Sequence, residues 1–199
     1  MKLIDIAFGA TLVAFALGSL AGALVTLLSP TFQAFLLVLI TSRIINPVRA
    51  TSVFGRVAVM ILIFLNNCVP VILSFVYPLI IGKVNWTPPM SKTTEKRLLS
   101  AFSFLTAGFL GFFNLGATLT LLATLKGLSA VIALLTASWL HAPLEFFFVL
   151  TCVAEPLRLA FQRVNTAEIV RVLRTDIGIV VICLIGLLAS AAIEVFAGA

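Results

Sequence analysis

Residues 57–82 read VAVMILIFLNNCVPVILSFVYPLIIG, a stretch of 26 residues without a charged side chain. A helix needs about 20 predominantly apolar residues to cross the hydrocarbon core of a bilayer. A strand of a membrane barrel would alternate polar and apolar residues, and this stretch does not. It therefore predicts a transmembrane helix.

The same kind of stretch recurs on both sides, with charge-free runs over 6–42, 98–125, 127–144, 146–154 and 177–193. Of the 199 residues, 62% are hydrophobic and 10% are charged, whereas soluble domains have roughly 45–50% apolar and about 25% charged residues. This composition excludes a soluble globular domain. It predicts an all-α fold, a polytopic transmembrane bundle of five or six helices that forms one integral membrane domain over residues 1–199.

The first span is predicted at 5–28 and is interpreted as uncleaved, because its charge-free run far exceeds the roughly 7–15 apolar residues of a signal peptide. Ser29-Pro30 would end it, since proline removes a backbone donor. Gly18 and Gly22 lie four apart on one helix face, which predicts a helix-packing seam. Residues 31–45 form a shorter apolar helix, marginal for a full crossing.

The formal net charge is +6, and the basic residues lie in short segments that flank the apolar runs. Such residues set orientation and meet anionic headgroups, so the lipid bilayer is the expected partner and nucleic acid is not. The cysteines lie inside apolar stretches with no C-x-x-C spacing. We therefore expect no disulfide framework, no metal site and no cofactor.

The sequence is compatible with two arrangements of its basic segments across the membrane. The segment 43–56 carries three arginines and no acid, which makes it a candidate cytoplasmic loop. If every long run crosses once, 43–56 and the basic segment 156–175 fall on opposite sides. A broken or re-entrant helix around 141–145, where Pro143 interrupts the run, would instead place both on one side. A basic helix is also predicted over 163–174, with a cap at Asn165.

His141 and Glu145 stand four residues apart inside an apolar stretch, so on a helix they share a face. An ionisable side chain in a membrane span usually turns toward a partner or a water-filled cavity. One hypothesis is a proton-relay or ligand-binding pair. The other is a structural hydrogen bond that holds a broken helix.

Further polar residues accompany these spans. Glu155 and Arg158 either pair at the membrane edge, or Arg158 anchors to lipid headgroups. Asn66, Asn67 and Asn114 are amides inside spans, and such side chains typically bridge helices. The sequence contains no G-x-S-x-G, H-E-x-x-H or Walker A motif. We therefore expect no enzymatic activity.

The order of these landmarks resembles a known family. Ile63-Phe64-Leu65-Asn66-Asn67, then Asn114-Leu115-Gly116, then His141-x-x-x-Glu145 and finally Leu157-Arg158-Leu159-Ala160 are similar to the stage II sporulation protein M family, over roughly residues 57–195. The family signature is His-Gly-x-x-Glu, and here Ala142 replaces the glycine. The resemblance implies a multi-pass protein without catalytic activity, with Asn67, Asn114, His141 and Glu145 at its site.

Two functions follow as hypotheses. The first is a membrane scaffold or assembly factor, which would bind other membrane or envelope proteins, or a second copy, through 83–97 or 163–174. The alternative is a small transporter or permease subunit that uses His141 and Glu145. An intramembrane enzyme would need a further ligand or nucleophile brought close by folding. Each hypothesis places the protein in the cell membrane.

Overall fold

A computed structural model describes residues 2–83, 90–162, 168, 171–172 and 176–196. Within these ranges every regular element is a helix, which confirms the predicted all-α bundle. Most of the predicted helix 163–174, and residues 84–89 of the connection 83–97, lie outside the described residues.

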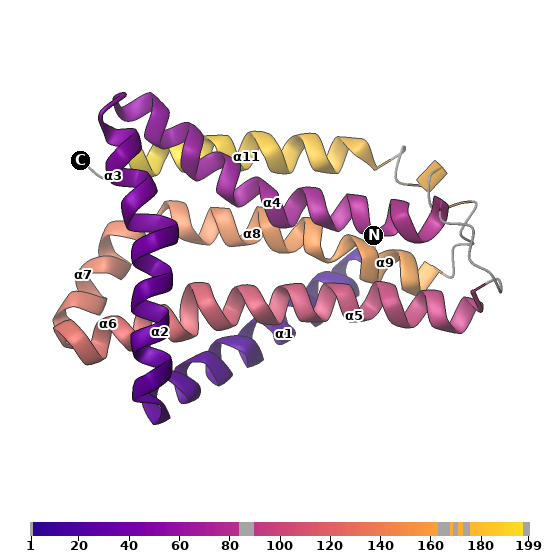
Figure 1. The fold of residues 1–199 in the computed structure, drawn as a ribbon. Helices are drawn as coiled ribbons and strands as arrows, with labels where there is room; N and C mark the ends of the chain where they lie inside the picture. The colour runs from indigo at the N-terminus through magenta and orange to yellow at the C-terminus, as the bar shows by residue number, and fades with distance from the viewer. Residues whose placement is uncertain (1, 84–89, 163–167, 169–170, 173–175, 197–199) are drawn as a thin grey trace.

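Four of the described helical stretches are long and apolar enough to cross a membrane. They are α1 (Lys2–Leu28), α4 (Arg56–Lys83), α5 (Lys92–Leu110) with its continuation into η2 (Gly111–Ala117) and α6 (Thr118–Lys126), and α11 (Ile177–Phe196). They run roughly along one axis (Figure 1). Helix α1 ends at Leu28, as expected from Ser29-Pro30.

A further path across the bundle consists of two shorter helices, α8 (His141–Val153) and α9 (Glu155–Gln162), joined at Ala154. Helix α8 packs against α4 and α11, and α9 packs against α5. The break in the chain falls at Trp139–Leu140, directly before His141. Helices α8 and α9 then run to the other end of the bundle, so of the two alternatives the described residues show the broken helix (Figure 1).

A transverse arm crosses one end of the bundle (Figure 1). It is a nearly continuous helix made of α2 (Pro30–Ile40), η1 (Thr41–Ile45) and α3 (Asn46–Ser52). Ser29 starts it, because its hydroxyl accepts a hydrogen bond from the Phe32 amide at 3.2 Å. Leu36 of this arm is buried against Ala117 and Leu121. The arm therefore packs across the apolar surface of the bundle and does not add a further helix along the bundle axis.

The two ends of the bundle differ in what they contain (Figure 1). The end crossed by the arm, called the arm end below, also holds α7 (Leu128–Ser138), the beginning of α8 and the end of α11. The opposite end holds the last turns of α4, the first turns of α5, and α9. The basic segment 43–56 and the described beginning of the segment 156–175, which belongs to α9, therefore lie at opposite ends.

Helix α1 and the α5–η2 stretch approach each other closely through glycines. A Cβ atom at Gly18 would collide with the Gly108 backbone, and one at Gly22 would collide with the Phe112 carbonyl. On the other side of the contact, Gly116 meets the Ser19 carbonyl in the same way. The glycines thus form a packing seam within one chain, which brings two backbones together.

Candidate functional site

The polar residues of the arm end are positioned by the beginning of α8. His141 is the first residue of this helix, and Glu145 lies one turn further along the same face. The Ser190 hydroxyl of α11 donates a hydrogen bond of 3.0 Å to the backbone carbonyl of His141. This bond fixes the start of α8 against the last turns of α11.

The packing of α8 on α11 brings a second carboxylate to the site. Glu194 lies one turn beyond Ser190, close to the end of α11. It lines a cavity of about 210 Å³ together with His141 and Glu145. The sequence analysis did not assign Glu194 to the site. The sequence feature that could have identified Glu194 is that it is the one acidic residue in the apolar stretch 177–196.

Helix α4 completes the cavity with two amides, Asn66 and Asn67. The Asn66 side chain is exposed and that of Asn67 is half-buried. Pro70 lacks a backbone N–H, so it cannot donate the helical hydrogen bond to the Asn66 carbonyl. Asn66 therefore presents two polar groups on this part of α4. One is its side-chain amide, and the other is a backbone carbonyl that accepts no hydrogen bond from residue 70.

The predicted His141–Glu145 pair shares the cavity but is not bonded. Among the described residues, no hydrogen bond or ion pair joins the imidazole of His141 to the Glu145 carboxylate. Both side chains are half-buried. The cavity thus holds two carboxylates, an imidazole and two amides, a set that can accept and release a proton.

This set does not match a structural metal centre. Among the described residues, no group of three or more His, Cys, Asp or Glu side chains could hold a metal ion. The buried thiols of Cys68, Cys152 and Cys183 are free and lie in the helical core.

The remaining predicted site residues lie elsewhere. Asn114 is on η2 with an exposed side chain, and it is not among the residues that line the cavity. Thus the structure brings together Asn66, Asn67, His141 and Glu145, and it does not add Asn114.

Glu155 and Arg158 form an ion pair toward the opposite end of the bundle. Arg158 Nε donates to Glu155 Oε2 at 2.8 Å, and its Nη2 also contacts Glu155 and Asp176. The Glu155 side chain is 2% exposed and that of Arg158 is 10% exposed. Of the two predictions for Arg158, an ion pair with Glu155 or an anchor to lipid headgroups, the structure shows the ion pair. Asp176, which sequence reasoning missed, ties α9 to the beginning of α11.

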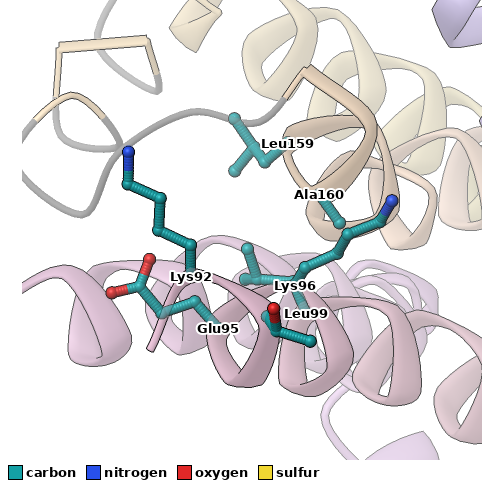
Figure 2. Close-up of a pocket in the computed structure, with 7 residues that line it drawn as sticks. Lys92, Glu95, Lys96, Leu99, Leu159 and Ala160 are labelled. Carbon is teal, nitrogen blue, oxygen red and sulfur yellow. The ribbon is translucent and has the colours of Figure 1, made fainter. Parts of the chain in front are cut away.

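A second cavity, of about 350 Å³, lies at this opposite end between α5 and α9. Figure 2 shows Lys92, Glu95 and Lys96 on the first turns of α5, with Leu159 and Ala160 of α9 across from them. Its charged side chains all come from one helix, and the facing wall is apolar. Lys96 also lies 5.9 Å from the centre of the Phe161 ring. This cavity resembles a solvated helix end more than a convergent site.

Comparison of the sequence with family models and curated proteins, and of the fold with solved structures, finds no match. The resemblance to the stage II sporulation protein M family therefore stays a prediction from the sequence.

Proposed function

We propose that the protein is a non-enzymatic, multi-pass protein of the cell membrane that takes up a proton at the cavity lined by His141, Glu145 and Glu194. In this role it would act as a small transporter or permease subunit. One observation carries the proposal: ionisable side chains of α8 and α11 and amides of α4 line a common cavity. A purely structural pair would be expected to lie in a dry helix interface.

Electrostatics supports a cationic ligand. Two carboxylates that share a cavity repel each other when both are ionised, and the repulsion is strong where water is scarce. A proton relieves this repulsion, and the imidazole of His141, which lines the same cavity, is a further group that can exchange protons. Binding is thereby coupled to the charge state of the site, as transport of an ion requires.

The distribution of basic residues supports an orientation. Among the described residues, the opposite end carries more basic residues than the arm end: Lys83, Lys92, Lys96, Arg97, Arg158 and Arg171. The arm end carries Arg43, Arg49, Arg56 and Lys126. Because cytoplasmic loops are enriched in Lys and Arg, the opposite end is proposed to face the cytoplasm, with the arm end on the outer face.

Flux through reconstituted vesicles tests the proposal. The purified protein, in vesicles with an internal pH dye, is expected to dissipate an imposed pH gradient, whereas Glu145→Gln and Glu194→Gln are expected to lose this activity. Asp5→Asn, an exposed acid near the start of α1, is the matched control and should keep it. Flux equal to that of protein-free vesicles, or flux unchanged in both site variants, would overturn the proposal.

A membrane scaffold or assembly factor is the second candidate, and the resemblance favours it. Asn67 of α4 meets His141 and Glu145 of α8 at one cavity, and all three residues carry the resemblance. In a scaffold this cavity would shape a surface for another membrane or envelope protein. Absence of flux, together with co-purification of a defined partner that is lost in His141→Ala, would support the scaffold and oppose the transporter.

A further inference from the structure

A larger groove adjoins the acidic cavity at the arm end. It has a volume of about 670 Å³ and lies between α3, the first turns of α4 and the end of α11. Gly55 makes it possible, because its φ of +93° turns the chain sharply between α3 and α4. The turn brings Arg49 and Arg56 to the walls of the same groove.

The two arginines are exposed and available for a ligand. Among the described residues, neither takes part in an ion pair. A guanidinium group presents a planar fork of donors that matches phosphate oxygens. Two such groups in one groove favour an anionic, phosphate-bearing ligand.

The other walls favour a lipid over a soluble anion. Val48, Val59 and Ile63 give the groove an apolar lining beside the arginines. At the tip of the α3–α4 turn, Val53 and Phe54 are each 82% exposed. Apolar side chains at the edge of a membrane protein bury themselves at the acyl boundary, so this turn would lie at headgroup depth. A phospholipid could there place its phosphate on the arginines and an acyl chain along the apolar wall.

The groove also contains an acid, Glu194, which it shares with the acidic cavity. Two positive groups and one negative group in one groove complement a phosphate that carries an ammonium group. We propose that this groove binds an aminophospholipid, with the phosphate held by Arg49 and Arg56 and the amine directed to Glu194. This inference goes beyond the proposed function and does not depend on ion flux, because it concerns lipid selectivity.

Lipid association measured by electron spin resonance tests it. The full chain is reconstituted in phosphatidylcholine vesicles containing a trace of a spin-labelled lipid: phosphatidylethanolamine, phosphatidylcholine or diacylglycerol. We expect the protein to retain phosphatidylethanolamine most and diacylglycerol least. The Arg49→Gln/Arg56→Gln double variant should lower the association of both phospholipids about tenfold. Glu194→Gln should remove only the preference for the amine.

Controls separate this outcome from a loss of folding or of charge in general. Lys126→Gln removes one basic side chain at the same end without touching the groove and should leave the selectivity unchanged. Arg49→Lys/Arg56→Lys keeps the charge and should restore part of the association, with an unchanged melting temperature. Equal retention of the three lipids, no effect of the double glutamine variant, or displacement of the lipid by inorganic phosphate alone would each overturn the proposal.

Discussion

His141 and Glu145 are ionisable side chains in an apolar setting, where they are costly to keep. Their cost is reduced here by a polar cavity and not by a bond between them. A side chain that only lines a cavity contributes little to packing.

We therefore expect His141→Ala to change the free energy of unfolding by less than about 1 kcal/mol, because the imidazole is half-buried and holds no second helix. Thermal unfolding in detergent checks this. A large fall in melting temperature would instead identify His141 as a structural residue and would weaken the case for a ligand site.

Arg158 is the contrasting residue, since it serves two acidic partners in a buried position. Arg158→Met should lower the free energy of unfolding by about 3–5 kcal/mol, because it leaves Glu155 buried without its counter-charge. Arg171→Met removes an arginine that is 78% exposed and 3.9 Å from Glu168; its effect should stay below about 1 kcal/mol. Similar melting temperatures for the two variants would contradict this reading.

At the scale of single residues, the sequence singles out ionisable groups that stand well inside an apolar run. His141 and Glu145 stood out for this reason. Glu194 could not be assigned to the same site from the sequence. Only the packing of α11 on α8 brings the end of α11 beside the beginning of α8. Likewise Asp176 lies 18 residues from Arg158, a separation at which local spacing predicts no contact.

Among the elements, the seam between α1 and the α5–η2 stretch depends on the absence of side chains. Gly18→Ala should lower the free energy of unfolding by about 1–3 kcal/mol, because its Cβ would meet the Gly108 backbone. Gly9→Ala in the same helix is the matched control, since nothing lies within 4 Å of its Cβ. It should be neutral or stabilising by up to about 1 kcal/mol. Equal effects of the two substitutions on the melting temperature would exclude the seam.

The long helices could be predicted because the length of an apolar run is a property of the local sequence. The transverse direction of the arm could not, since it depends on the contacts of Leu36 with η2 and α6. The π-helical turn of η2 was also missed. In it the Thr118 hydroxyl donates to the carbonyl of Phe113, five residues earlier, at 2.6 Å. Nothing in local propensity marks such a turn.

For the whole molecule, the orientation proposed from the basic residues predicts which end reacts with a membrane-impermeant maleimide. Lys126→Cys lies at the exposed end of α6, at the arm end, and should be labelled in intact cells. Lys92→Cys lies at the start of α5 and should react only after permeabilisation. The native cysteines are buried and give little background. The opposite pattern would reverse the orientation.

His141, Glu145 and Glu194 are proposed to line a wet, acidic cavity, and thiol reactivity at Asn67 tests this most directly. Asn67→Cys in reconstituted protein is treated with a cationic and an anionic methanethiosulfonate reagent, with the fully buried Val71→Cys, one turn away, as control. We predict that Asn67→Cys reacts about tenfold faster with the cation, that Glu145→Gln/Glu194→Gln removes this preference, and that Val71→Cys stays unreactive. An unreactive Asn67→Cys, or equal rates with both reagents, would contradict the account.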